Sequence, residues 1–374
     1  MKNLFSRDNK TLNTAPPSAI PLIDFDAFTS RANTATSQEK QAIAQDLVYA
    51  FRTAGFVYLR NHGVPDSDVA RMFKASAAFF ALRQAEKVFA IISKLSMLLS
   101  QCLAIVNLMA FLNQQQDKIS WESPESNRGY AAVGREKLTE LDKEGRVEDI
   151  KTLNKINPDL KESLDIGKNV PDTKYKNKFH SAEFEEQCES FFQMMQLVNL
   201  RVMSAVAQGL DLKKKEFFTQ FIDKSNNTLR LLHYPQVSVE KFSDKSRRCG
   251  AHCDYGSWTF LFQDNVGGLE VQERSTNKYV RATPIPNTVL VNVGDLLQRW
   301  TNDYLISTEH RVVQPYEVDE AGYLPARYSI VYFCNPNSDV EIEPLEQFIE
   351  DNCKKYSPVN AGKYLIGRLS STYV

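Results

Sequence analysis

The sequence predicts an α+β protein in which helices come first and short strands build the core. Upstream of residue 215, apolar residues recur with helical periodicity in long runs. From Thr228 onward the pattern changes to short runs rich in β-branched and aromatic residues, separated by turn residues. Short strands punctuated by turns are typical of a barrel or a sandwich. We therefore expect a strand-built core with flanking helices.

The individual elements follow from these patterns. Helices are expected at residues 37–53, 65–82, 184–210 and 361–369, where apolar residues share one face or follow a proline start. The last of these could lie across the mouth of the barrel. Strands are expected at residues 229–234, 258–263, 269–272, 289–293, 311–313 and 328–334.

Composition limits the class of protein. The chain has 374 residues, of which 43% are hydrophobic, so it can bury a large core. Its net charge of −1 gives no footprint for nucleic acid, so no nucleic-acid partner is expected. Six cysteines form no framework of paired spacings, which suits a reducing compartment. With no secretory signal in the polar N-terminus, we expect a cytoplasmic protein, and a monomer.

A metal site is indicated by His252 and Asp254, which are separated by one residue. In an extended segment, residues i and i+2 project to the same side, so both side chains can reach one ion. His310 precedes the β-branched pair Val312 and Val313, which indicates that it opens a buried strand. Two imidazoles and one carboxylate suit a mononuclear iron(II) centre with open coordination positions.

Arg327 and Ser329 repeat the same spacing in a predicted strand. A guanidinium and a hydroxyl on one face make a receptor for a carboxylate. An anion anchored there could extend toward the iron and chelate it with a second carboxylate and a keto oxygen. 2-Oxoglutarate has that shape.

These residues, together with further motifs, resemble the iron(II)/2-oxoglutarate-dependent dioxygenases, in the branch related to isopenicillin N synthase. The shared motifs occur in the family's order along most of the chain: Pro21-Leu22-Ile23-Asp24-Phe25, Gly55 to Val64, Arg128-Gly129-Tyr130, Leu229 to Pro235, Gly267 to Val271 and Asn292-Val293-Gly294-Asp295. Several ordered motifs are far more specific than any single one.

The resemblance implies a fold, a set of residues and a reaction. The core would be a double-stranded β-helix, or jelly roll, at residues 216–340, after a flexible tail (1–18) and an N-terminal region (19–215) and before a C-terminal helical segment (341–374). His252, Asp254 and His310 would bind Fe(II), Arg327 and Ser329 would hold the distal carboxylate of 2-oxoglutarate, and Tyr234 would add a hydrogen bond.

With O2, and ascorbate as a candidate reductant, such an enzyme hydroxylates, desaturates or cyclises a small organic substrate of specialised metabolism, releasing succinate and CO2. Leu232 departs from the asparagine that plant members often carry, which weakens the transfer to Tyr234. Arg281, Phe262, Gln298 and Trp300 lie near the ligand strands in sequence and are candidates for the substrate pocket.

Other interpretations stay open. A 2-oxoglutarate-independent oxidase is one, because the Arg-x-Ser pair also occurs in members that bind a carboxylate of their own substrate. A non-catalytic or membrane-tethered homologue is another. Zinc at Cys249 and Cys253 lacks the second ligand pair of a structural site. His62, His180 and His233 are better read as structural histidines.

The segment 88–116 breaks the family pattern, because relatives run almost directly from a sequence like Phe80-Ala81-Leu82 to one like Asp117-Lys118-Ile119. It contains an uncharged apolar run at residues 95–112, near the lower limit for crossing a membrane. A buried helix is the simpler alternative. Its bounding residues also permit codons of a retained intron read in frame, a hypothesis that transcripts all containing these codons would contradict.

Overall fold

The computed structural model describes residues 20–97, 119–138, 159–169, 174–239, 248–314, 318 and 320–373, with side chains left aside at 83–97. The predicted flexible tail (1–18) therefore lies outside the described residues, as does the larger part of the predicted insertion (88–116). The domain boundaries drawn from the sequence stay predictions.

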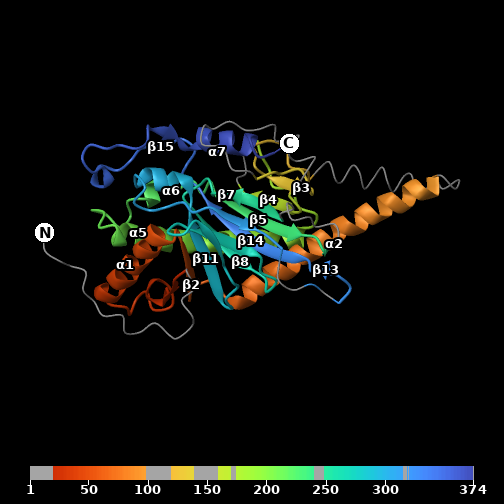
Figure 1. The fold of residues 1–374 in the computed structure, drawn as a ribbon, viewed down its shortest axis with the longest axis horizontal. Coiled ribbons are helices and arrows are strands. Elements are labelled where there is room, and N and C mark those ends of the chain that lie inside the picture. Colours follow the sequence, from red (N-terminus) through yellow and green to blue (C-terminus); the bar gives the residue numbers. More distant parts are fainter. Residues whose placement is uncertain are drawn as a thin grey trace.

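Two sheets form the core (Figure 1). The larger sheet has eight strands, which in spatial order are β1 (Leu22–Asp24), β2 (Phe56–Arg60), β11 (Thr288–Val293), β8 (Trp258–Gln263), β14 (Arg327–Cys334), β5 (Thr228–Tyr234), β4 (Glu162–Gly167) and β3 (Gly129–Ala131). The smaller sheet has four, β10 (Lys278–Arg281), β9 (Leu269–Glu273), β12 (His310–Val312) and β7 (Cys249–His252). Two short ribbons pair β13 (Tyr323–Leu324) with β6 (Val237–Ser238) and β15 (Glu341–Ile342) with β16 (Val359–Asn360).

The described helices are α1 (Ser37–Thr53), α2 (Asp66–Met97), α5 (Ala182–Gly209), α6 (Asp295–Trp300) and α7 (Ala361–Ser370), with short 3₁₀ turns η1 (Asp26–Phe28), η2 (Thr219–Phe221) and η4 (Glu346–Phe348). Helix α1 begins at a capping box in which Thr36 and Glu39 satisfy each other's backbone N–H groups. None of the helices in the described part is both long and apolar enough to cross a membrane.

Side-chain alternation gives the large sheet two different faces. On one face, Phe260 of β8 and Tyr332 of β14 pack with helices α1, α2 and α5 in the main apolar cluster. Trp258 belongs to that face, and its indole N–H donates to Asn199 of α5 at 2.8 Å. On the other face, Tyr234 and Val331 pack against residues of the small sheet in a second apolar cluster. The space between the two sheets is where the site lies.

The predicted strands all appear within two residues of their expected bounds, and so do three of the four predicted helices. Helix α2 differs, because it continues to Met97 instead of ending at residue 82. Residues 83–97 contain no glycine or proline and several strong helix formers, so nothing in their sequence stops the helix. The helix thus enters the predicted insertion at its first ten residues, 88–97.

Candidate functional site

Strand β7, strand β12 and the loop after β7 bring three donor side chains together. His252 and His310 are register partners on the adjacent strands β7 and β12. Asp254 follows β7. Its backbone carbonyl oxygen accepts a hydrogen bond from Asp295 N at 2.8 Å, which holds this residue in place. Donor atoms of His252, Asp254 and His310 all lie within 4.8 Å of one another, and no other such group of three or more occurs among the described residues. Neither Cys249 nor Cys253 belongs to it.

The arrangement fits a single metal ion. Nε2 of each histidine lies 3.8 Å from the same oxygen, Oδ1 of Asp254. Metal–nitrogen bonds of about 2.1 Å allow two ligand atoms of one ion to be up to about 4.2 Å apart. The other ring nitrogen of His252 contacts Gly250 O at 2.8 Å, and that of His310 contacts Thr308 O at 3.2 Å. Since a carbonyl can only accept, both Nδ1 atoms carry the proton and both Nε2 atoms keep a free lone pair.

The electrostatics agree with this geometry. Burial, followed by the neighbouring His310, lowers the pKa of His252 to about 3, so the ring is neutral at neutral pH. Burial by itself raises the pKa of Asp254, but the two histidines and a hydrogen bond from Asn292 outweigh it and leave the pKa below its usual value. The group therefore offers two imidazoles, of which that of His252 is neutral, and one carboxylate.

A buried guanidinium lies further along the same cavity, which Arg327 and Ser329 line together with the three donor residues. Arg327 is 1% exposed and donates to Ser329 Oγ at 3.3 Å and Gln263 Oε1 at 3.2 Å. Its Nε has no partner, and no carboxylate of the described residues lies within ion-pair distance of it. The guanidinium lies over the Tyr234 ring, 4.9 Å from its centroid. A buried guanidinium that lacks a carboxylate partner is suited to bind an anion.

Comparisons with known proteins identify the family. Residues 225–336 match the family model of the 2OG-Fe(II) oxygenase superfamily, and residues 20–97 match that of the non-haem dioxygenase in morphine synthesis N-terminal. The 2-oxoglutarate-Fe(II) type oxidoreductase ppzD of Metarhizium rileyi is 33% identical, with 88% of this chain and 85% of that protein covered. The chain belongs to the 2OG-Fe(II) oxygenase superfamily. The proline hydroxylase buaE of Petromyces alliaceus is 30% identical, with 92% of this chain and 98% of that protein covered.

Among solved structures, a full-length Neurospora crassa protein in complex with alpha-KG and thymine has a TM-score of 0.75 and 36% identity, with 94% of this chain and 96% of that chain covered. The family predicted from the motifs and its jelly-roll fold are thus confirmed. The chain is a non-haem iron(II) oxygenase that depends on 2-oxoglutarate. A 2-oxoglutarate-independent oxidase is not favoured. Ascorbate as the reductant stays a prediction.

The four pocket candidates of this oxygenase were wrong. Phe262 and Trp300 lie in the main apolar cluster, and neither they nor Arg281 and Gln298 line the cavity. Phe262 packs edge-on against His62 and Phe191, because it points to the helical face of β8. Its neighbour Leu261 lines the cavity instead. The chosen residues were near the ligand strands in sequence but on the wrong face or outside the barrel.

Several residues around the oxygenase site have no role predicted from the sequence. Asn292 of β11 donates from Nδ2 to Asp254 Oδ2 at 2.6 Å, which directs the other oxygen toward the histidines. Arg248 is fully buried, and two of its nitrogens have no partner. Burial, and secondly the charge of Arg327, lower the pKa of Arg248 to about 10. Asn292 belongs to a family motif, so the sequence contained a signal for its importance. No signal in the sequence indicated a role for Arg248.

Replacing Asn292 with alanine tests how the oxygenase orients its carboxylate. Without the amide, Asp254 can rotate and lose the position from which Oδ1 faces the histidines, so iron(II) affinity is expected to fall about 10- to 100-fold. Anaerobic iron(II) titration followed by equilibrium dialysis measures the loss. Asn335→Ala is the matched control, since Asn335 lines the same cavity but donates to Asn226 O. Equal losses in both variants would contradict this role.

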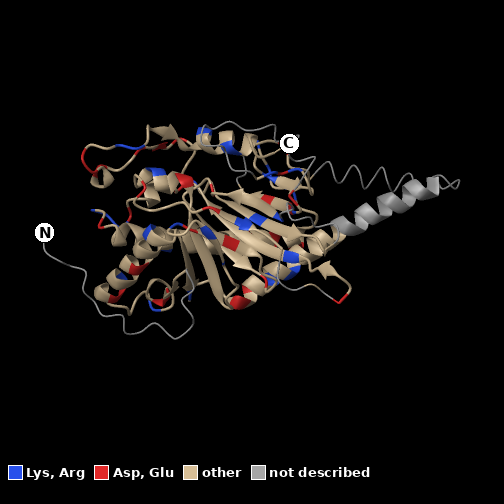
Figure 2. Cartoon of the chain, in the orientation of Figure 1, with Lys and Arg blue, Asp and Glu red and all other residues tan. Residues whose placement is uncertain are grey.

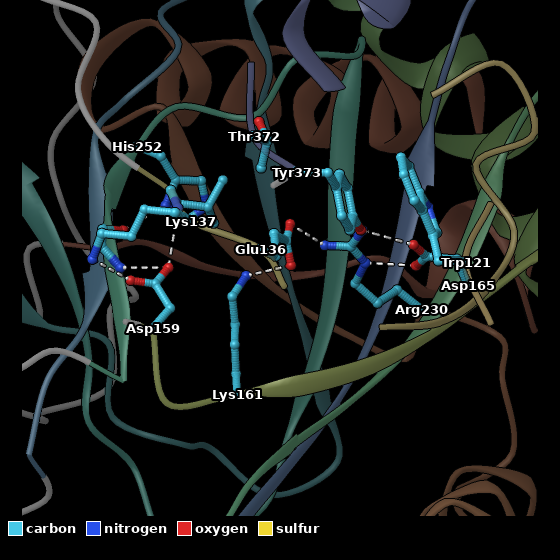
Figure 3. A network of polar contacts seen from close by, with 12 residues as sticks. Trp121, Glu136, Lys137, Asp159, Lys161, Asp165, Arg230, His252, Thr372 and Tyr373 are labelled. Atoms are coloured by element: carbon cyan, nitrogen blue, oxygen red, sulfur yellow. Dashed lines mark hydrogen bonds and ion pairs between the residues drawn. The ribbon is translucent and has the colours of Figure 1, made fainter. Parts of the chain in front are cut away.

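One part of the cavity wall is charged. Glu136, Lys161 and Arg230 line the cavity. Figure 3 shows these three in a chain of contacts with Asp165 and Tyr373, and it shows Lys137 paired with Asp159 nearby. The C-terminal segment covers this end, because Leu365 and Leu369 of α7 also line the cavity. Thr372 Oγ1 lies 2.9 Å from the Tyr255 hydroxyl, and the Tyr373 ring stacks on Trp121 at 3.7 Å. The predicted helix across the mouth is present.

Proposed function

We propose that His252, Asp254 and His310 bind Fe(II), and that Arg327 and Ser329, assisted by Tyr234, bind the distal carboxylate of 2-oxoglutarate. The observation that carries this proposal is the convergence of both free Nε2 atoms on one carboxylate oxygen, in a cavity that also contains a buried guanidinium with no ion partner among the described residues. Bound iron supplies the oxidising chemistry that couples O2 and 2-oxoglutarate to oxidation of a substrate C–H bond, with release of succinate and CO2.

The protein's own residues position and protect this chemistry. Arg327 fixes one end of the co-substrate by paired charge-assisted hydrogen bonds, so that its keto acid faces the three donors. Burial raises the pKa of Tyr234 to about 12, so its hydroxyl remains a neutral donor at physiological pH. Leucine, valine and phenylalanine residues make up half of the remaining residues that line the cavity, and they exclude water.

The substrate is a small organic molecule, and we propose hydroxylation as the reaction. The names of the relatives give two candidate types of substrate, a free amino acid such as proline and a pyrimidine base such as thymine. Lys and Arg residues are interspersed with Asp and Glu residues along the described chain (Figure 2), and together with the balanced net charge this supports the absence of a nucleic-acid partner. The free thiols among the described cysteines support a cytoplasmic location. We further propose that the protein is a monomer.

Stoichiometry tests this function. The iron(II)-loaded enzyme is incubated with 2-oxoglutarate and a substrate panel, and succinate and hydroxylated product are quantified together. One succinate per hydroxylated product is expected. Product formed at full rate without 2-oxoglutarate would restore the oxidase interpretation, and the absence of succinate in every reaction would contradict an active oxygenase. A variant lacking iron ligands serves as the blank.

A further inference from the structure

The charged wall of the cavity is electrically balanced. Lys137 contacts Asp159 at 2.9 Å, Lys161 contacts Glu136 at 2.8 Å, and Arg230 contacts Glu136 at 2.8 Å. Arg230 also binds Asp165 through two parallel contacts of 2.6 and 2.8 Å. Among the described residues, three cations therefore face three carboxylates, and all six side chains are at least nine-tenths buried. These six side chains together have no surplus charge to offer a ligand.

Burial raises the pKa of a carboxyl, so the charge state of the acids needs support. Although burial acts against it, the charges of Arg230 and Lys161 lower the pKa of Glu136 to about 2. Burial raises the pKa of Asp165 above its usual value, although the charge of Arg230 and its two contacts with the carboxylate act in the opposite direction. Lys161 has its pKa raised above the usual value, since nearby acidic groups outweigh its burial. Each cation of the wall thus contacts a carboxylate, and the formal charges of the six side chains sum to zero.

The cations of the charged wall differ in how many of their N–H groups have no hydrogen-bond partner among the described residues. Arg230 uses Nε, Nη1 and Nη2, in contacts with Asp165, Glu136 and the Tyr373 hydroxyl. Lys161 has three N–H groups, and among the described residues its one hydrogen-bond partner is Glu136 Oε2. Lys161 lines the cavity that the donor residues also line, and it is 4% exposed. Buried donors without partners are costly, so a ligand atom in the cavity would stabilise them.

We propose that Lys161 binds a neutral carbonyl oxygen of the substrate, and that the substrate is a cyclic amide rather than a free amino acid. This inference rests on the proposed function. A carbonyl accepts from the unused N–H groups of Lys161 without changing the charge of the wall. A free amino acid brings a carboxylate and an ammonium group, and neither would find an unpaired protein charge of opposite sign on the described wall, so burying both is strongly unfavourable.

The co-substrate end offers no spare cation either, among the described residues that line the cavity. Iron(II) and Arg327 together carry three positive charges, and Asp254 with dianionic 2-oxoglutarate carries three negative charges. Arg248 is a further buried cation near Arg327, but it does not line the cavity, and the charge of Asp264 acts on it. A substrate carboxylate would therefore find no unpaired cation on the described wall of the cavity. Thymine, with two ring carbonyls and no charge, fits this requirement, whereas the carboxylate of L-proline does not.

Calorimetric titration of the anaerobic complex with iron(II) and 2-oxoglutarate tests the inference. The probes are thymine, uracil and 2-piperidone as neutral cyclic amides, and L-proline and L-pipecolate as amino acids. At least one cyclic amide is expected to bind wild-type enzyme, at least 10-fold more tightly than either amino acid. Lys161→Met is expected to weaken that binding at least 10-fold, while the dissociation constant of 2-oxoglutarate changes less than twofold.

Lys137→Met is the matched control, because it removes a cation of the same network that does not line the cavity. It is expected to change cyclic amide affinity less than threefold. If Lys161→Met fails to fold, the double variant Glu136→Gln, Lys161→Met keeps the charges balanced and replaces it, with the same expected loss. Equal losses in Lys161→Met and Lys137→Met would overturn the role of Lys161.

The substrate class is overturned if no cyclic amide binds wild-type enzyme, or if an amino acid binds more tightly. These failures differ from failure of the proposed function, in which 2-oxoglutarate itself would not bind the iron(II) enzyme and no succinate would form with any substrate.

Discussion

Replacement of His310 by alanine is expected to lower turnover at least about 1000-fold, because two remaining ligands cannot hold iron(II) in the geometry that leaves positions open for co-substrate and O2. Asp254→Ala should have the same effect, since Oδ1 of Asp254 is the atom that both Nε2 atoms approach. Succinate formation measures turnover, and anaerobic iron(II) titration measures the metal directly.

The matched control is His62→Ala. His62 is also a buried histidine, but its ring packs on Phe262 and its Nδ1 accepts from Val64 N at 3.2 Å, away from the donor group. This variant should keep iron(II) binding within about threefold of wild type, although it loses packing. Stoichiometric iron binding and succinate formation in His310→Ala would show that the ligand set is assigned wrongly.

Arg327→Met is expected to raise the KM for 2-oxoglutarate about 100-fold. Removing one partner of a buried charged pair costs about 2 to 5 kcal/mol, which corresponds to a change of about 30-fold to several thousandfold. Arg327→Lys should keep part of the affinity for 2-oxoglutarate that Arg327→Met loses, because lysine retains the positive charge but lacks the planar guanidinium that forms two parallel hydrogen bonds. Initial rates of succinate formation at varied 2-oxoglutarate concentration give these constants.

Two comparisons separate binding from general damage. Arg311→Met removes an arginine of β12 whose partner is Glu270, at 2.9 Å and outside the cavity, and should leave the KM for 2-oxoglutarate unchanged. 2-Oxopentanoate lacks the distal carboxylate, so the preference of the enzyme for 2-oxoglutarate over this acid should shrink in Arg327→Met. An unchanged preference would place the distal carboxylate elsewhere.

Short-range spacing made the main residues of the site visible in the sequence. The pairs His252 and Asp254, and Arg327 and Ser329, each share a side because extended backbone repeats every two residues. His310 was placed by the β-branched residues that follow it, which mark a buried strand. These inferences needed no knowledge of the fold beyond local geometry.

The pocket candidates failed for a related physical reason. In a strand, a shift of one residue moves a side chain to the opposite face of the sheet. Phe262 therefore joins the helices while Leu261 faces the cavity. Proximity to a ligand strand in sequence says nothing about which face a residue occupies. Ser329 lines the cavity and is the register partner of Gln263. Every second residue counted from Gln263 along β8 shares that face, so Leu261 faces the cavity and Phe262 does not. This pairing is known only from the folded sheet.

The sequence by itself determined the donor types, their pairing along each strand and the family to which the chain belongs. Tertiary structure decided the rest, because it depends on segments far apart in the chain. Asn292 meets Asp254 across 38 positions, and Arg230 meets Glu136 across 94. The charge balance of the cavity wall arises only where such segments are buried together and every charge must find a partner.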